Sequence, residues 1–239
     1  AWSTAATLTM STPLPNTPTI TVSADQDADR AVITVTPVAT SGYISPNIYV
    51  QRSDDGGVTW TAVRSASGIQ GVFGVGSIFY DYEAPRVQAV QYRAQVQASY
   101  SGFVNGSAWS AGVSTVIDAT TWNLKHPNLP TLNMIDVQVV SRPTEQVQED
   151  LGVFRPLGRR YPVVVAGSLT GSDGELQVIC SSAAEWDSLR ALAEAQAVLR
   201  LESLFGWSKY IRLIAGAKSE LYGTPTNPLR KVGLAYVEV

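Results

Sequence analysis

Very few residues in this chain suit catalysis by a histidine base or a thiol. His126 is the only histidine and Cys180 the only cysteine among the 239 residues. A zinc site built from Cys and His alone is therefore excluded, as is an intrachain disulfide. His126 precedes Pro127 in a segment that reads as a linker, and the chain has no Gly-x-Ser-x-Gly motif. We expect His126 to be a structural residue and Cys180 to be a small buried hydrophobic residue.

Carboxylates are the other candidates for chemistry. Asp81 and Glu83 lie two residues apart on one strand face, but such pairs are more often solvated than catalytic. Asp25, Asp27 and Asp29 alternate as in a calcium loop, although the central glycine and the later glutamate of a hand-type loop are absent. A loose Ca²⁺ site there stays open as an alternative. We predict no catalytic residue, no metal and no cofactor, and expect that the protein is not an enzyme.

The elements that position these residues are divided between two globular domains. A 45% hydrophobic and 15% charged composition is typical of folded proteins, and the length allows two cores. Residues 1–118 carry 5 arginines and no lysine against 8 acidic residues, whereas residues 119–239 carry 12 basic and 12 acidic residues. We predict a linker over residues 1–16, one domain over residues 17–118 and another over residues 119–239.

The first residues read as a connection. Ala1–Met10 lacks a basic segment followed by an apolar core, so we predict no signal peptide. Thr4–Pro18 is rich in proline and is typical of an extended linker, which leads us to expect a domain before it. No apolar run approaches the roughly 20 residues that cross a bilayer, so we expect no membrane insertion.

Short alternating strands separated by turns fill residues 17–118. Ala31–Val35 alternates, and Val90–Ala98 places Tyr92, Ala94 and Val96 on one face with glutamines and Arg93 on the other. Asp54–Gly57 predicts a tight turn between a strand ending at Ser53 and a return strand over Val58–Val63. A last strand is predicted over Gly112–Ile117. Many strands without helical periodicity favour an antiparallel sandwich.

Three short motifs make this domain similar to fibronectin type III domains. Tyr92-Arg93-Ala94-Gln95-Val96 resembles their Y-R-V-x-A strand, Trp109-Ser110 resembles their W-S element, and Trp60 stands where they often place a core aromatic. We interpret Trp60, Tyr92 and Trp109 as core residues. The alternative is an adhesive surface that stacks sugars on aromatic side chains; its candidates are Tyr43, Tyr49, Tyr80, Tyr82, Tyr100 and Phe103.

The second domain combines strands with one helix. Strands are predicted before the helix over Met134–Val140, Tyr161–Ala166 and Glu175–Cys180, and after it over Val198–Leu201, Tyr210–Ile214 and Leu229–Val239. Ser141–Gly152 reads as a loop and Ser168–Gly174 as the turn of a hairpin. Ser182 and Glu185 form a capping box before a helix of about 13–15 residues with an apolar face. This order predicts an α+β domain with one helix on a half-open antiparallel sheet.

This half resembles the tube-like domain of distal tail proteins, and in particular minor tail proteins of long-tailed phages that infect actinobacteria. The resemblance rests on segments in the expected order: Trp122–Pro127, Val153–Arg159, Pro162–Val165, Gly174-Glu175-Leu176 and Tyr236–Val239. It implies a structural part of the virion at the tail tip, assembled with copies of itself in a ring or trimer and with other tail proteins. The sandwich would then decorate the outside, or, as the alternative, bind a host cell-surface glycan.

Charges near the predicted loop are candidates for the contacts between subunits. Opposite charges on adjacent copies set register and orientation, and a merely solvated loop is the alternative. The candidate oligomer interface consists of Glu145, Glu149, Asp150, Arg155, Arg159 and Arg160. Three arginines are too few for a nucleic-acid site, and with a net charge of −3 we expect no sequence-specific nucleic-acid binding.

Overall fold

The structure is a computed structural model that describes the backbone of residues 13–154, 163–214, 218–224 and 227–239, with side chains outside residues 141–171 and 215–228. The protein is mainly β, with 55% of residues in strands and one α-helix among the described residues, as the sequence predicts. It divides into two compact units. Unit 1 comprises residues up to Gln26, Arg30–Ala84 and Gln88–Ile117, and unit 2 comprises Asp27–Asp29, Pro85–Val87 and Asp118–Val239.

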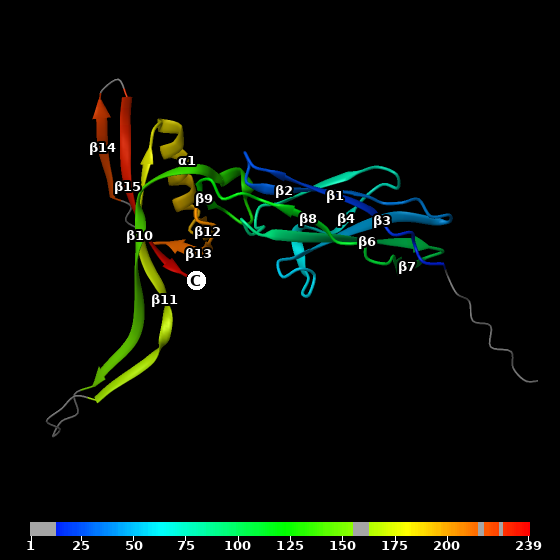
Figure 1. Cartoon of the computed structure of the whole chain (residues 1–239), viewed down its shortest axis with the longest axis horizontal. Coiled ribbons are helices and arrows are strands. Elements are labelled where there is room, and N and C mark those ends of the chain that lie inside the picture. Colours follow the sequence, from blue (N-terminus) through cyan, green and yellow to red (C-terminus); the bar gives the residue numbers. More distant parts are fainter. Residues whose placement is uncertain (1–12, 155–162, 215–217, 225–226) are drawn as a thin grey trace, which may run out of the picture. The chain divides into compact units, whose positions relative to one another are not determined.

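Unit 1 is an antiparallel sandwich of two sheets (Figure 1). Its strands are β1 (Thr19–Asp25), β2 (Arg30–Thr36), β3 (Tyr43–Ser53), β4 (Thr61–Gln70), β5 (Ser77–Asp81), β6 (Ala89–Tyr100), β7 (Phe103–Gly106) and β8 (Val113–Val116). One sheet has the order β1-β2-β5; the other has the order β4-β3-β6-β7, with β8 also on β6. Every second residue of β6 from Val90 to Ala98 is buried, which confirms the predicted alternation.

The first hairpin forms, but its return strand starts later than predicted. β3 pairs with β4 through Gln51↔Ala62, while residues 58–60 remain in the loop. The Asp55 carboxylate causes the delay, because it accepts hydrogen bonds from the backbone N–H groups of Val58 (3.1 Å) and Thr59 (2.9 Å). An aspartate that binds the backbone a few residues on keeps that backbone out of a strand ladder.

The last residues of the predicted linker lie against unit 1. The Asn16 backbone N–H donates to the Thr40 hydroxyl at 2.8 Å, and its side-chain amide donates to the Ala39 carbonyl at 2.9 Å. The Tyr43 hydroxyl donates to the Pro13 carbonyl. Residues 13–16 are thus part of the folded unit, and the rest of the predicted linker lies outside the described residues.

The sheet of unit 2 closes on itself. Its strands are β9 (Trp122–Lys125), β10 (Met134–Phe154), β11 (Val163–Cys180), β12 (Val198–Glu202), β13 (Ser208–Leu213), β14 (Lys218–Thr224) and β15 (Asn227–Glu238). The order is β11-β10-β9-β12-β13-β15-β14, and β15 also pairs with β11, so the strands from β11 to β15 form a closed ring. The prediction of a half-open sheet is therefore wrong, because β15 pairs with β11 along one of its edges and with β13 along the other.

Two segments predicted to be irregular are strands. Ser141–Gly152, expected as a loop, belongs to β10, and Ser168–Gly174, expected as a turn, belongs to β11. Polar residues continue as strands here because β10 and β11 pair with each other along their length, as in Glu145↔Gly174. Gly174 fits under the ring of its other partner, Tyr236, which compensates for the weak strand preference of glycine.

The helix begins as the sequence predicts, with one change of partner. Helix α1 (Ala183–Glu194) buries Leu189 and Leu192. A short 3-10 helix, η1 (Pro130–Leu132), lies earlier in the chain, between β9 and β10. The Ser182 hydroxyl accepts from the Glu185 backbone N–H at 3.1 Å. The Glu185 carboxylate reaches back to the backbone N–H of Ser181 at 2.7 Å, one residue before the N-cap.

A two-stranded ribbon, formed by Val147–Phe154 of β10 and Val163–Ser172 of β11, extends beyond the closed sheet (Figure 1). Among the described residues, β9 pairs with β10 only at residues 134 and 137, and β15 pairs with β11 only over residues 173–180. The ribbon strands therefore pair only with each other. Two register shifts interrupt their ladder, between Val147 and Glu149 and between Glu149 and Leu151.

Replacing Gly174 by alanine is expected to destabilise unit 2. A Cβ at this position would lie 2.3 Å from Tyr236 Cζ, and Tyr236 is fully buried, so the ring has no room to move aside. We expect a loss of about 2 kcal/mol in the free energy of unfolding, measured by urea denaturation. Gly233→Ala is the control, because its Cβ would meet only the flexible carboxylate of Glu175. Equal stabilities for the two variants would contradict this packing.

Candidate functional site

A cluster of buried charged residues is the most unusual feature of unit 2. Lys125 ends β9 and Glu202 ends β12; Asp29 lies in the β1–β2 loop and Arg86 in the β5–β6 loop, and both of these loop segments belong to unit 2. No side chain in this set is more than 3% exposed. Arg200, two residues before Glu202, adds a third cation at 3.0 Å from Glu202 Oε1. We call these five residues the charge cluster.

Two cations bridge the two carboxyl groups. Lys125 Nζ contacts Asp29 Oδ2 and lies 2.8 Å from Glu202 Oε2. Arg86 Nε donates to Asp29 Oδ1 at 2.8 Å and lies 3.4 Å from Glu202 Oε2. Buried charges are tolerated only when they are paired in this way, because each alone would be strongly destabilised by loss of water.

Neutral groups complete the shell of Asp29. The Asn123 amide donates to Asp29 Oδ2 at 2.6 Å, and Lys125 Nζ also donates to the Asp29 backbone carbonyl at 2.6 Å. Arg86 Nη1 donates to the backbone carbonyls of Thr121 (2.8 Å) and Ser203 (3.1 Å). Asp29 is thereby fixed from several directions, and it is not available for the calcium loop considered from the sequence.

The two carboxyl groups differ in acidity. Burial opposes ionisation of Asp29, but the hydrogen bond from Glu202, the charge of Lys125 and the hydrogen bond from Arg86 outweigh it and lower the pKa of Asp29 below its usual value. Burial, followed by the hydrogen bond to Asp29, raises the pKa of Glu202 to about 7. Near neutral pH, the pair therefore consists of an ionised Asp29 beside a Glu202 that holds a proton for much of the time.

No family model matches the chain, and a search of the curated proteins finds no match to it. Within the part of the chain that the structure describes, no group of three or more His, Cys, Asp or Glu residues could hold a metal ion. In the same part, no helix is both long and apolar enough to cross a bilayer. The function must therefore be argued from the geometry.

The sequence did not single out the charge cluster. Its members are distant along the chain, at positions 29, 86, 125, 200 and 202, so no spacing connects them. The sequence contained one signal of the cluster, which is that charged residues alternate with leucines in a short strand. Arg200 and Glu202 alternate with Leu199 and Leu201, and all four side chains are buried. His126, expected in a linker, directly follows the buried strand β9, and its Nδ1 accepts from the Asn128 backbone N–H at 3.2 Å.

The predicted interface residues are only partly described. Glu145, Glu149 and Asp150 lie on β10, in a strand rather than in the predicted loop. Their side chains lie outside the described residues, as do Arg155, Arg159 and Arg160 altogether. The proposed pairing of opposite charges between copies stays a prediction.

Of the three aromatic residues predicted to be core, only Tyr92 is fully buried. Trp60 and Trp109 are half-buried and lie outside the hydrophobic core, so that prediction is wrong for both. Their rings hold the Arg93 guanidinium at 4.2 Å and 4.6 Å from the ring centroids. Arg93 also donates to Gln51 Oε1 at 2.9 and 2.7 Å, which fixes the stack on the outer face of the sheet.

Most of the candidate sugar-stacking aromatics already have partners inside unit 1. Tyr43 packs on Tyr100 with ring centroids 5.1 Å apart. Tyr80 and Tyr82 both face Arg30, whose guanidinium lies 3.9 Å from the Tyr80 ring centroid. Phe103 is 69% exposed. These residues do not form a shared open platform.

The predicted carboxylate pair is also engaged in structural contacts. Asp81 Oδ2 lies 3.0 Å from Arg52 Nη1 and accepts from the buried Tyr92 hydroxyl at 3.1 Å. Glu83 Oε2 pairs with Arg64 at 3.0 Å. Burial, followed by the charge of Asp81, raises the pKa of Tyr92 above its usual value. Asp81 is thus a buried anchor of the sandwich.

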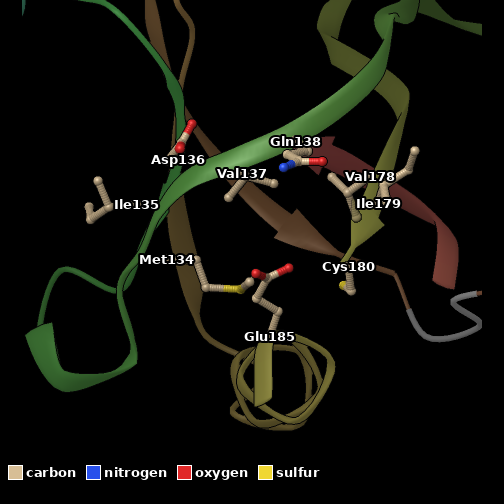
Figure 2. Close-up of a pocket in the computed structure, with 9 residues that line it drawn as sticks. All are labelled: Met134, Ile135, Asp136, Val137, Gln138, Val178, Ile179, Cys180 and Glu185. Carbon is tan, nitrogen blue, oxygen red and sulfur yellow. The ribbon is translucent and has the colours of Figure 1, made fainter. Parts of the chain in front are cut away.

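A small cavity of about 60 Å³ lies between β10, β11 and α1 (Figure 2). Figure 2 shows the Glu185 side chain pointing from the helix toward Met134 and the strands. Cys180 is buried beside it, and burial followed by the charge of Glu185 raises the pKa of the Cys180 thiol, as fits a packing residue. The cavity is far below the roughly 300 Å³ of ligand pockets.

Glu202 is expected to make stability pH-dependent. Its folded-state pKa is raised from 4.5 to about 7, so its contribution is fully present below about pH 4.5 and is lost as the pH rises through about 7. We expect the wild type to lose roughly 3 kcal/mol of unfolding free energy between pH 5 and 8 relative to Glu202→Gln. Urea denaturation at several pH values measures this. The control is Glu194→Gln on the exposed surface of the helix, which should leave the pH dependence of the wild type unchanged. If the unfolding free energies of the wild type and Glu202→Gln changed in parallel with pH, the raised pKa of Glu202 would be contradicted.

The stack around Arg93 yields a second prediction. Arg93→Ala removes the cation from between two indole rings, and we expect a loss of about 1–2 kcal/mol in unfolding free energy, with a change in tryptophan fluorescence. Arg64→Ala is the control, because Arg64 is 55% exposed and pairs with Glu83 at the surface, where ion pairs contribute less than about 1 kcal/mol. Equal losses of unfolding free energy in Arg93→Ala and Arg64→Ala would show that the stacking of Arg93 on the indole rings does not contribute to stability.

Proposed function

We propose that the chain is a structural subunit of a phage tail tip that assembles with copies of itself around the tail axis. The ribbon is the observation that carries this proposal. An isolated two-stranded ribbon is marginally stable in water, and three or more strands or a packed partner are needed to hold it. A ribbon that leaves its own sheet therefore favours a protein whose fold is completed by a neighbour.

The composition of the ribbon supports the same conclusion. Its outer part pairs Leu151–Phe154 with Val163–Ala166, and these eight residues include no charged or polar side chain. Residues of this type are normally covered when a protein folds or assembles, because burial of apolar surface is favourable. A second copy of the chain is the occupant that we propose, since the resemblance of this half is to ring- or trimer-forming tail proteins.

Sheet closure limits where a neighbour can add strands. β15 pairs with both β11 and β13 and so closes the ring of strands, and among the described residues the ribbon and β14 lie outside this ring. Strand addition to an exposed edge is a common mode of association. The acidic residues Glu149 and Asp150 on the ribbon and the arginines at 155, 159 and 160 would set the register between copies.

The sandwich would serve as a decoration domain in this assembly. The alternative, an adhesive module that binds a host glycan, has less support, because most of its candidate aromatics contact arginines or one another. The contacts of the described residues favour a structural role for unit 1.

A charge placed in the ribbon is expected to block assembly. Val164 lies opposite Val153, so Val164→Glu puts a carboxylate into the apolar outer part of the ribbon. Native mass spectrometry should show a ring or trimer for the wild type and at least about tenfold weaker association for the variant. The control is Val58→Glu, at an 80% exposed loop position of unit 1.

Two outcomes would contradict the proposal. A wild-type chain that stays monomeric at all concentrations tested would remove self-assembly. A proteomic analysis of purified particles of the source virus that finds no copy of the chain would remove the tail-tip assignment, whatever its oligomeric state.

A further inference from the structure

The charge cluster places one amine in contact with two side-chain carboxyl groups. We propose that Lys125 and Asp29 become joined by an intramolecular isopeptide bond, with Glu202 as the proton carrier. The bond would join Lys125 Nζ to Asp29 Cγ and release one water molecule. This inference concerns a modification of unit 2 and does not depend on the proposed role in a phage tail.

Proximity is the first argument. Lys125 Nζ contacts Asp29 Oδ2 and is also held at 2.6 Å from the Asp29 backbone carbonyl oxygen. Both side chains are at most 3% exposed, and Lys125 stands at the end of a strand that pairs with β10 and β12. Groups fixed in contact react as if at very high concentration, because the entropy of bringing them together is lost during folding.

Glu202 supplies the proton transfers. Its Oε2 lies 2.8 Å from Lys125 Nζ, the same nitrogen that contacts Asp29 Oδ2. Glu202 gives its proton to the Asp29 carboxylate and takes one from the Lys125 ammonium. This leaves a neutral amine beside a neutral carboxylic acid, with Glu202 again protonated. Such a transfer is needed because an ammonium has no free electron pair and a carboxylate is a poor electrophile.

The bond-forming step then balances without any other reactant. The Nζ electron pair attacks Asp29 Cγ, and the electrons of the C=O bond move to oxygen. Glu202 carries a proton from the nitrogen to the hydroxyl oxygen, the C–O bond breaks, and water leaves as the C=O bond re-forms. An ammonium and a carboxylate become an amide and water, and Glu202 ends in the state in which it began.

Arg86 and Asn123 are placed to assist. Arg86 Nε donates to Asp29 Oδ1 at 2.8 Å, where negative charge develops when the amine attacks. The Asn123 amide donates to Oδ2 at 2.6 Å and fixes the orientation of the carboxyl plane. Burial keeps bulk water away, so the reverse hydrolysis is disfavoured once the product water has left.

The mass of the full chain tests the proposal. We expect intact mass spectrometry of the purified, denatured wild type to give the sequence mass less one water molecule. Trypsin digestion should yield a branched peptide that joins the peptide ending at Arg30 to the segment containing Lys125, with no cleavage after Lys125. Lys125→Arg and Asp29→Ala should have their full sequence masses, and Glu202→Gln should react to a much smaller extent.

Controls separate this reaction from other losses of water. Lys209→Arg replaces another lysine of unit 2 that is paired with a carboxylate, at 3.2 Å from Glu238, and should keep the loss. A wild type of full mass after prolonged incubation at neutral pH, with normal cleavage after Lys125, would overturn the proposal even if every variant failed to fold. Loss of water that persists in Lys125→Arg would overturn it as well.

Discussion

Unit 2 is organised around the need to pair a buried lysine. An ammonium group without water is tolerated only beside carboxylates, and Lys125 has two, from Asp29 and Glu202. The loops that bring Asp29 and Arg86 each contain a residue in the left-handed region, Asp29 itself (φ 48°) and Val87 (φ 62°). A β-branched residue rarely adopts this conformation, so the contacts of the charge cluster must outweigh a local backbone cost.

The closed sheet of unit 2 and its ribbon both result from the length of β10 and β11. β10 and β11 are longer than the strands beside them, so their inner parts complete the ring of strands while their outer parts continue alone. The inner part carries Gly174, which accommodates the Tyr236 ring, and the end of the outer part, where Leu151–Phe154 pairs with Val163–Ala166, carries no charged residue. One hairpin thus provides both a wall of the core and the surface that we propose for assembly.

Local patterns predicted local structure well. The alternation of β6 and the Ser182 cap are visible in the sequence because each depends on neighbouring residues. Trp60 and Trp109 were misplaced, since a short motif cannot distinguish a core ring from one that stacks on an arginine. The charge cluster was missed and the closed sheet mistaken for an open one for the same reason: both depend on contacts between distant residues, such as Lys125 with Asp29, which leave no periodic signal.

The closed sheet also constrains the order of folding. Its hairpins β10–β11, β12–β13 and β14–β15 join neighbouring segments, whereas Leu124↔Leu201 and Leu176↔Leu234 join segments far apart in the chain. Long-range pairing is slow because a large loop must be ordered before any contact compensates for it. We expect the hairpins to form early and ring closure to limit the rate, so that stopped-flow refolding is slowed by mutations at the β11–β15 seam.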